Sequence, residues 1–486
     1  MKNGMKKIMI AVALVLLSLS GCTSTRQTNS RTDTGASSES PRALNLGKQF
    51  AQSGSSTTNS LVQPPSWTLF EDPGLVKLLE QFDLENPNVE AALARVDQAR
   101  ARYGLSAVDK SPVLRGQGDA TWRRDSENGF FVADPPDYEQ FQLGLNLEYE
   151  LDLWGRVRHS VEASYAEFEA EETEAIASLL PLRAQLVRTW YQLQALDIER
   201  RLLEQGIALR EESLKLVDAQ VRGGAATEVD LARARTELAL TRVDTFEISR
   251  NTETLQNLLA SLCGVVPAEF ISPQALALES GPETDRLIPI PSAGLPADIL
   301  RRRPDLVVAE KRLQAAHSRI GLAKASYLPK FSIGAGAGLS SLSLSDLFDV
   351  KSLFTSIGPD VTIPLYNGGR NKQDAVLAEA ATREAYASYK ALALNAVRQV
   401  EDALSKTRWL DQQIEALNTA VAAASETERL STRRYDGGVA SYLEVLDAQR
   451  TSLNARRQLA GIRAARRMAL VDLVEALGGG WNASAE

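Results

Sequence analysis

The chain has 486 residues, of which 62 are acidic and 54 are basic, and its formal net charge is −8. Removing residues 1–21 takes away three lysines and moves that charge from −8 to −11. Nucleic acids require concentrated positive surface, so we expect no nucleic-acid partner.

The N-terminus has the features of a targeting segment. Three lysines precede an apolar run from Ile8 to Leu19, which is too short to cross a bilayer as a helix. The run ends in the sequence LSGC at residues 19–22, the lipobox of a bacterial lipoprotein. We therefore predict a signal peptide over residues 1–21 and a covalent lipid on Cys22. We expect no other cofactor and no metal. The alternative is a coincidental cysteine after an ordinary signal peptide.

The residues after the lipobox indicate where the protein resides. Thr23, in place of an aspartate, follows the cysteine, which by enteric-type sorting rules predicts the outer membrane. Residues 22–60 are rich in Ser, Thr, Asn and Gly and are predicted to be a lipidated flexible tether.

The rest of the chain is an internal duplication. Residues 86–114 match the sequence 217 positions later, and residues 147–245 match the sequence 214 positions later. A repeat of this length determines the architecture. We predict a first repeat over residues 61–264, a linker over 265–298, a second repeat over 299–478 and a C-terminal tail over 479–486.

Each repeat contains a predicted strand hairpin, over residues 112–153 and 329–366. Apolar and polar residues alternate from Phe141 to Leu153, and the same alternation begins at Leu114 and Phe331. A period of two predicts strands with one apolar and one polar face. The fourth strand is less regular, with its apolar side running from Leu353 to Leu365.

Two interpretations of these strands remain open. The sheet could be half-buried on a soluble core, or it could be part of a transmembrane barrel with lipid outside and water inside. Four strands cannot close a barrel, and open edges are not stable in lipid, so a barrel requires several copies. Two copies would give eight strands and a filled interior, whereas three would give twelve and room for a channel.

Long helix hairpins are predicted over residues 155–262 and 369–478. Leu179, Leu186 and Leu193 begin a heptad pattern that continues to Val221, which indicates helices that supercoil on partners. At 1.5 Å per residue each rod would extend about 100 Å, comparable to the width of a periplasm. Pro181 is expected to bend the first rod. Cys263 follows the first hairpin and is predicted to be a small buried residue.

A glycine pair separates the two helices of each hairpin. Gly223-Gly224 and Gly437-Gly438 provide the left-handed residue that ends a helix. Thr227 and Ser441 are predicted to cap the next helices, each in a capping box with the acid three residues later, Asp230 and Glu444.

Several segments resemble the outer membrane efflux protein family, the TolC-type outer-membrane factors, and in particular its lipidated OprM-like (NodT-type) branch. The resemblance covers essentially the whole chain beyond the tether. The matching segments are PSWTLFEDPGL, ELDLWGR, RRRPDL, IPLYNGGR and RYDGGVASYLEVLDAQR, of which the last is the most specific.

The resemblance implies a mainly α fold with β strands that assembles as a TolC-like homotrimer. Three copies would form a twelve-stranded β-barrel in the outer membrane, four strands from each chain, continued by a periplasmic α-helical barrel. An equatorial belt, formed by the linker over residues 265–298 and by the C-terminus, would surround the tunnel. The implied partners are a periplasmic membrane-fusion adaptor protein and an inner-membrane RND pump.

The resemblance also implies two functional sites. The hairpin tips would dock the adaptor, and their residues are Gly223, Gly224, Ala225, Ala226, Thr227, Gly437, Gly438, Val439, Ala440 and Ser441. A periplasmic gate would consist of Leu443 and Asp447, with Arg450 and Tyr435 as partners in closing. Leu443 and Asp447 are four residues apart and so share a helix face. The alternative is that Asp447 makes only a surface salt bridge.

The predicted function is therefore an outer-membrane exit duct that exports small molecules such as drugs. Type I protein secretion and metal-ion efflux are alternatives within the channel class, and a structural coiled-coil lipoprotein is an alternative outside it. An enzyme is not expected, because His159 and His317 are the only histidines and no nucleophile or phosphate-binding motif accompanies them.

Overall fold

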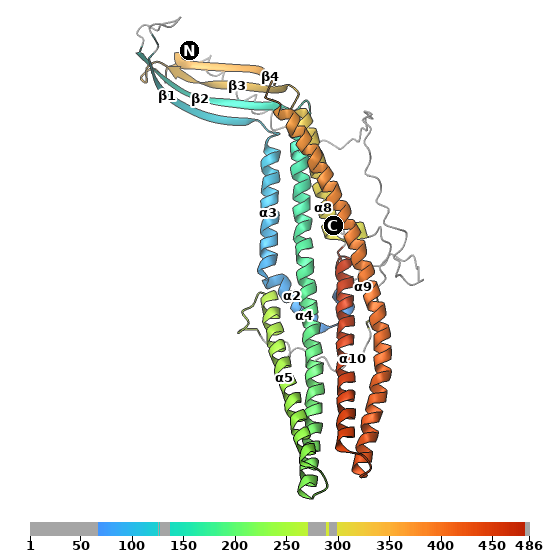
Figure 1. Ribbon diagram of the computed structural model, residues 1–486. Helices are drawn as coiled ribbons and strands as arrows, with labels where there is room; N and C mark the ends of the chain where they lie inside the picture. Colours follow the sequence, from blue (N-terminus) through green and yellow to red (C-terminus); the bar gives the residue numbers. More distant parts are fainter. Residues whose placement is uncertain (1–66, 125, 127–136, 271–287, 291–298, 482–486) are drawn as a thin grey trace. The chain divides into compact units, whose positions relative to one another are not determined.

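The computed structural model describes residues 67–124, 126, 137–270, 288–290 and 299–481 (Figure 1). The predicted signal peptide, the tether with Cys22 and most of the predicted linker 265–298 lie outside these residues. The fold is mainly helical with one small antiparallel sheet, and the same order of helix, strand pair and long helix pair occurs twice. The elements are η1 (Trp67–Phe70), α2 (Pro73–Glu85), α3 (Pro87–Val108), β1 (Val113–Arg124), β2 (Asp137–Leu151), α4 (Arg156–Arg222), α5 (Glu228–Leu262), α7 (Ile299–Arg302), α8 (Pro304–Ala325), β3 (Lys330–Ser341), η4 (Val350–Ser352), β4 (Leu353–Thr362), α9 (Arg370–Asp436) and α10 (Tyr442–Ala476).

The four strands form a single antiparallel sheet in the order β1-β2-β3-β4. Leu114 pairs with Leu147, Leu147 with Ala335, and Ala335 with Ile357, so one row of apolar residues crosses the sheet. The two outer members of this row are open to solvent within the chain, at 62% for Leu114 and 82% for Ile357, and Leu147 and Ala335 between them are half-buried. The alternation therefore predicted the strands correctly, and the described residues do not bury this face in a core.

The fourth strand is shorter than the sequence pattern indicated. We expected its apolar side to continue to Leu365, but β4 ends at Thr362 and Leu365 is 92% exposed. The reason is local, since Pro364 has no N–H to donate to a ladder. Gly368 and Gly369 then take positive φ values of 67° and 84° and turn the chain into α9.

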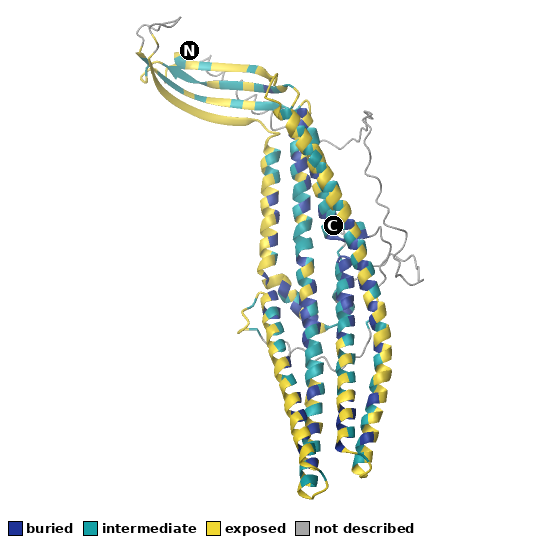
Figure 2. Ribbon diagram, in the orientation of Figure 1, coloured by how far each residue is buried: buried dark blue, intermediate teal, exposed yellow. Residues whose placement is uncertain are grey.

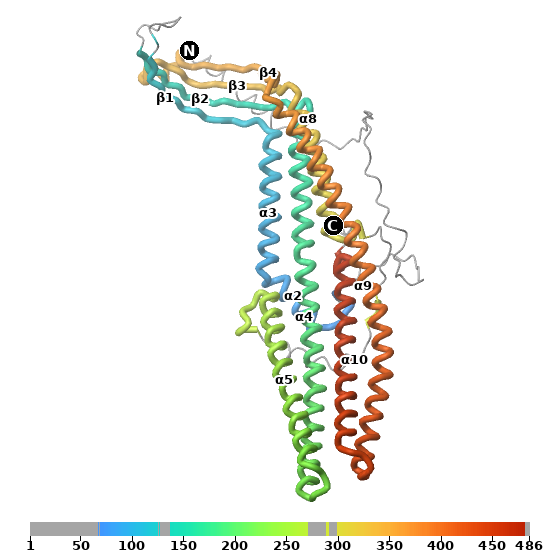
Figure 3. The backbone as a smooth tube through the Cα atoms, in the orientation of Figure 1, coloured from blue at the N-terminus to red at the C-terminus, as the bar shows by residue number. Residues whose placement is uncertain are grey.

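The two long helices, α4 and α9, have 67 residues each and are followed by helices of 35 residues, α5 and α10. α4 continues through Pro181 without a break. It packs along α3, α5, α8 and α10, while α9 packs along α8 and α10. Segments from the two repeats thus lie side by side, as α4 and α10 do in Figure 3. Among the described helices, none combines the length and apolar composition needed to cross a bilayer.

The last helix of each hairpin ends beside the start of the helix that precedes a strand pair, and the two are joined by equivalent hydrogen bonds. The side chain of Asn86, which caps α3, donates to the carbonyl of Leu262 at the end of α5 (2.6 Å). Arg303 precedes α8 and donates to the carbonyl of Ala476 at the end of α10 (3.2 Å). Asn86 and Arg303 are 217 positions apart and are related by the repeat. We call these two contacts the joints.

The main core surrounds Trp190 of α4, which is 1% exposed. Figure 2 shows buried residues gathered where α2 lies against α4. Asp72 connects this core to α2. One carboxylate oxygen accepts from the backbone N–H of Gly74 (3.0 Å) and Leu75 (3.2 Å), and so caps the helix. The other accepts from the indole N–H of Trp190 (2.8 Å) and the amide of Gln194 (3.0 Å). The DPGL sequence at residues 72–75, part of the PSWTLFEDPGL segment, therefore caps α2. Through Asp72 it also holds the indole of Trp190 in the core.

Cys263 is fully buried in the same core, as the sequence predicted. Its Sγ lies 4.0 Å from the carbonyl oxygen of Leu78. Burial raises the pKa of this thiol to about 12, so it stays protonated at neutral pH and does not act as a nucleophile.

Candidate functional site

The tips of the two hairpins have the same backbone geometry. In each glycine pair only the second residue is left-handed, with φ of 73° at both Gly224 and Gly438. The next N–H folds back on the helix: Ala225 donates to the carbonyl of Gln220 (2.8 Å), and Val439 donates to the carbonyl of Arg434 (2.9 Å). Both turns are therefore the glycine-ended helix termini that the sequence predicted.

The two tips differ in how the following helix is capped. Thr227 forms the predicted capping box, in which its hydroxyl oxygen accepts from the N–H of Asp230 and its own N–H donates to that carboxylate, each at 3.3 Å. The box predicted at Ser441 is wrong, because its side chain makes no capping bond. Glu444 instead accepts from Arg434 (2.8 Å), and this charge-assisted bond draws the carboxylate away from the cap.

The predicted docking residues are open to solvent. At both tips the glycines are exposed, while Ala226 and Ala440 are half-buried. Val439 presents an apolar side chain that is 68% exposed. The two turns thus offer a matching small, apolar surface.

Behind the tips, the two hairpins pack on each other through a small apolar cluster. Its buried members are Val217, Leu231, Ala234, Tyr442 and Leu446. Tyr435 lies at its edge, where its hydroxyl donates to the side-chain oxygen of Gln220 and its ring stands 5.8 Å from that of Tyr442. Of the predicted gate residues, Tyr435 therefore joins α9 to α4.

Leu443 and Asp447 lie on an exposed face of α10, where Leu443 is 48% exposed. Arg450, one turn later, donates to Glu237 of α5 through Nε (2.9 Å) and through a second guanidinium nitrogen. Asp447 adds a weaker favourable charge, which helps to raise the pKa of Arg450 after the larger effect of Glu237. From the sequence we expected Arg450 to act together with Asp447, and no sequence pattern pointed to Glu237.

A second arginine repeats this contact two helical turns later. Arg457 donates to Asp244 of α5 (3.0 Å) and to Glu199 of α4 (2.8 Å). Arg450 and Arg457 are seven residues apart, as are Glu237 and Asp244, and both pairs are separated by 213 positions in the chain. We call the two α10–α5 contacts, Arg450–Glu237 and Arg457–Asp244, the arginine ladder.

Glu237 also faces a cation that is itself buried. The guanidinium of Arg210 of α4 lies 4.0 Å away, and the two side chains are 7% and 8% exposed. The hydrogen bond from Arg450 is the main cause that holds the pKa of Glu237 below its usual value, and Arg210 adds to it. Burial lowers the pKa of Arg210, and its Nε has no hydrogen-bond partner among the described residues.

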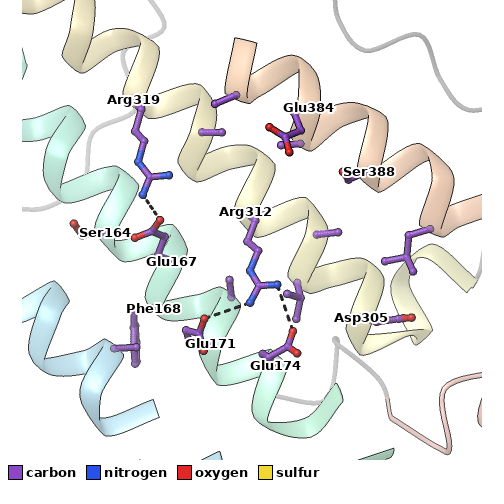
Figure 4. Close-up of a pocket in the computed structure, with 18 of the residues that line it drawn as sticks. Ser164, Glu167, Phe168, Glu171, Glu174, Asp305, Arg312, Arg319, Glu384 and Ser388 are labelled. Atoms are coloured by element: carbon purple, nitrogen blue, oxygen red, sulfur yellow. Dashed lines mark hydrogen bonds and ion pairs between the residues drawn. The ribbon is translucent and has the colours of Figure 1, made fainter. Parts of the chain in front are cut away.

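A groove of about 670 Å³ lies far from the tips, near the start of α4, between α3, α4, α8 and α9 (Figure 4). Its floor is crossed by ion pairs, in which Arg312 reaches Glu171 (3.3 Å) and Glu174 (3.7 Å), and Arg319 reaches Glu167. Burial raises the pKa of Glu174, and Arg312 opposes the shift. Arg312 and Arg319 thus pair with acidic residues of the same groove. Within the described ranges, no three His, Cys, Asp or Glu side chains are grouped as metal ligands.

Comparisons with known proteins agree with this architecture. A family model described as outer membrane efflux protein matches residues 78–265 and 295–479. The cation efflux system protein CusC of Escherichia coli is 30% identical over 446 residues, which is 90% of this chain and 94% of that protein. The solvent efflux pump outer membrane protein SrpC of Pseudomonas putida is 30% identical over 442 residues, covering 90% and 92%. The crystal structure of a membrane protein from Pseudomonas aeruginosa matches with a TM-score of 0.81 and 30% identity, covering 90% and 96%.

Proposed function

The chain belongs to the outer membrane efflux protein family, and we propose that three copies form the outer-membrane exit duct of a tripartite efflux system. Each copy contributes its four strands to a twelve-stranded transmembrane barrel, and the long helices form a tunnel across the periplasm. Cys22 carries the lipid anchor. Residues 265–298 and the C-terminal tail contribute to a belt around the tunnel.

The observation that carries this proposal is the pair of open edges of the sheet. Among the described residues β1 pairs with β2 alone and β4 with β3 alone, so the outer sides of both strands lack a strand partner. Such edges are not stable in lipid, where backbone groups cannot bond to water. Joining β4 of one copy to β1 of the next removes both edges. Three copies leave room for a channel, whereas eight strands from two copies would be filled by side chains.

The helices support the same closure. α5 packs on α4, and its other side exposes Val229, Leu240, Val243 and Phe246 at 58%, 56%, 59% and 73%. α9 exposes small residues at helical spacing, Ala416, Ala420 and Ala423. A stripe of large apolar side chains suits a seam of alanines, because small residues let two helices approach closely. This match favours α5 of one copy packing on α9 of another.

The tips are the proposed contact with the other components. Their exposed turns, Gly223–Thr227 and Gly437–Ser441, would dock a periplasmic membrane-fusion adaptor, which links the duct to an inner-membrane RND pump. Leu443 and Asp447 would form the gate at the periplasmic entrance. Three copies around an axis bring these residues together as an apolar ring and a carboxylate ring.

The proposed cargo is small molecules such as drugs. The solvent efflux protein SrpC and the cation efflux protein CusC match the chain at 30% identity each, so both kinds of cargo occur among its relatives. Metal-ion efflux is the second candidate for that reason. The low number of thioether and imidazole side chains, four Met and two His in the whole sequence, gives it less support.

Three measurements test the proposal. The purified protein should be a trimer by cross-linking and should conduct ions in a planar bilayer. Deletion of the gene should sensitise cells to dyes, detergents and antibiotics, whereas sensitivity to metal ions alone would favour the second candidate. A stable monomer without conductance would contradict the duct and favour a structural lipoprotein.

A further inference from the structure

We propose that Phe354 of β4 forms a binding site for planar aromatic cargo near the extracellular opening of the duct. Its ring lies on a floor of glycines, on the face of the sheet that would line the water-filled lumen. This inference rests on the proposed function, because the lumen exists only once the barrel has closed. It gives the barrel a part in selecting cargo, in addition to the passage that the duct provides.

Phe354 lies on the polar face of the sheet, near the end where loops join the strands. Its partners along this row of the sheet are, in order, Gly338 of β3, Gly144 of β2 and Gln117 of β1. Paired residues of adjacent strands project from the same face, and successive residues of a strand project from opposite faces. Phe354 therefore shares the face of Gln117, and Leu353 shares the apolar face. In the proposed barrel the apolar face contacts lipid, so the ring of Phe354 faces the lumen.

Glycines form the floor under the ring. A Cβ added at Gly338 would lie 2.9 Å from Cε1 of Phe354, and a Cβ added at Gly144 would lie 3.4 Å from its Cζ. The ring therefore extends from β4 over β3 to β2, and it occupies the space that side chains would take there. Phe354 is half-buried, so part of its ring remains accessible to a solute.

The wall beside the ring is also formed by glycines. Gly334, Gly336 and Gly338 follow one another at every second position of β3, and Gly358 of β4 pairs with Gly334. Glycine weakens the interior of a strand, and it often marks a place where a ligand or another backbone approaches closely. At Gly334 an added Cβ would meet only the carbonyl oxygen of Gly358, at 4.0 Å, and at Gly358 it would meet nothing within 4 Å. At these two positions the wall is open to a solute.

Long polar side chains cover the other half of the same face. Between β1 and β2, Arg115 pairs with Glu148 (3.3 Å) and Asn146 donates to Gln117 (3.3 Å). The face is thus divided into a half with charged and amide side chains and a half in which glycines surround Phe354. A flat aromatic solute fits the second half, because it can lie along the glycines and stack on the ring. The contact is partly exposed and therefore weak, as a transport path requires, since the cargo must also leave.

The test is thiol labelling of trimers in phospholipid vesicles. Ser356→Cys places a thiol two residues from Phe354 on the same face of β4, about 7 Å away. A charged, water-soluble maleimide should label this thiol, and ethidium, a planar aromatic cation, should slow the labelling by about two- to fivefold. Tetraethylammonium, a cation without a ring, should not slow it. The wild type gives the background, because Cys263 is fully buried and Cys22 is proposed to carry the lipid.

Variants of the ring identify its part in the protection. In the Ser356→Cys chain, Phe354→Ala should abolish the protection by ethidium, and Phe354→Trp should retain it. Leu353→Ala is the matched control, because it removes a large apolar side chain, 47% exposed, from the opposite face of the same strand. Protection that persists in Phe354→Ala, or that Leu353→Ala abolishes equally, would overturn the inference. Should Phe354→Ala not assemble, Phe354→Leu decides, since it keeps apolar bulk but has no aromatic face.

The outcomes separate this inference from the proposed function. Ile357→Cys, on the apolar face, should be labelled far more slowly than Ser356→Cys. If the two thiols are labelled alike, or if the protein is a monomer, the sheet encloses no lumen and the proposed function fails first. If Ser356→Cys alone is labelled rapidly and ethidium does not slow its labelling, the duct stands and the aromatic site does not.

Discussion

Arg450 of α10 donates to Glu237 of α5, with Nε 2.9 Å from Oε2 and 213 positions between the two residues. This contact joins the two halves of the duplication at the level of the proposed entrance. Because α10 belongs to the second repeat and α5 to the first, neither hairpin makes it alone.

The current through the closed duct should depend on pH in a way set by Glu237. Its pKa is lowered by Arg450 of α10 and Arg210 of α4, the two cations that face it, so its contribution to stability is present above the usual glutamate value. That contribution is lost only as the pH falls through the lower, folded value. The current should therefore stay low at about pH 5 and rise only below the usual glutamate pKa of about 4.3. Recordings of wild type and Glu237→Gln across pH check this, and a rise at neutral pH would contradict it.

Asp447→Ala should increase the closed-state current, because it removes the carboxylate ring proposed at the entrance. Asp97→Ala on α3 is a suitable control, since its side chain is 76% exposed and pairs only loosely with Arg100 (3.5 Å). An unchanged current in Asp447→Ala would leave Asp447 as a surface residue without a role in gating.

Gly438→Trp should abolish resistance to dyes and antibiotics in complemented cells while trimer formation and conductance persist. The residue has open space around it, so an indole there would project into the surface proposed to dock the adaptor. Gly438→Ala adds one carbon and should retain most of the resistance. Full resistance in the tryptophan variant would argue against docking at this tip.

Gly264→Ala should destabilise the protein far more than Gly224→Ala, although the two residues have nearly the same φ, 74° and 73°. A Cβ at Gly264 would overlap the carbonyl oxygen of Glu85, whereas at Gly224 it would meet nothing within 4 Å. The expected cost is about 1–2 kcal/mol at Gly224, from backbone strain alone. At Gly264 it is about 3 kcal/mol or more, because overpacking is added. Heating purified trimers and following their dissociation measures the stability loss of each variant. Equal losses of stability in Gly264→Ala and Gly224→Ala would contradict the contact at Glu85.

Asp72→Ala should lower stability by about 2–3 kcal/mol, the sum of a lost helix cap and a buried indole N–H left without an acceptor. The same thermal dissociation measures it, with Asp97→Ala expected within about 0.5 kcal/mol of wild type as an exposed control. If Asp72→Ala matches that control, the Asp72–Trp190 hydrogen bond does not order the core.

The sequence predicted best those elements whose structure depends on residues close together along the chain. Alternation from Phe141 located β2, and the glycine pairs located the ends of α4 and α9, because each is a local pattern. The arginine ladder could not be found in this way. Its acids look like ordinary charges on a helix surface, and only packing brings them to arginines 213 positions away. The capping box predicted at Ser441 is absent for a related reason. Glu444 accepts a hydrogen bond from Arg434 of the preceding helix, and that contact depends on packing.

The joints at Asn86 and Arg303 give the chain two kinds of helical rod. α4 and α9 are single rods, whereas α5 with α3 and α10 with α8 are rods in two pieces that meet at a hydrogen-bonded seam. The seams are not equal, because Arg303 also donates to Gln399 of α9 (2.7 Å) and to Asp305 (2.6 Å), while Asn86 is a neutral amide. Torsion applied at the tips is therefore resisted along the full length of α4 and α9. We expect it to bend the two-piece rods at their seams, and to do so more readily at Asn86, where the link is uncharged.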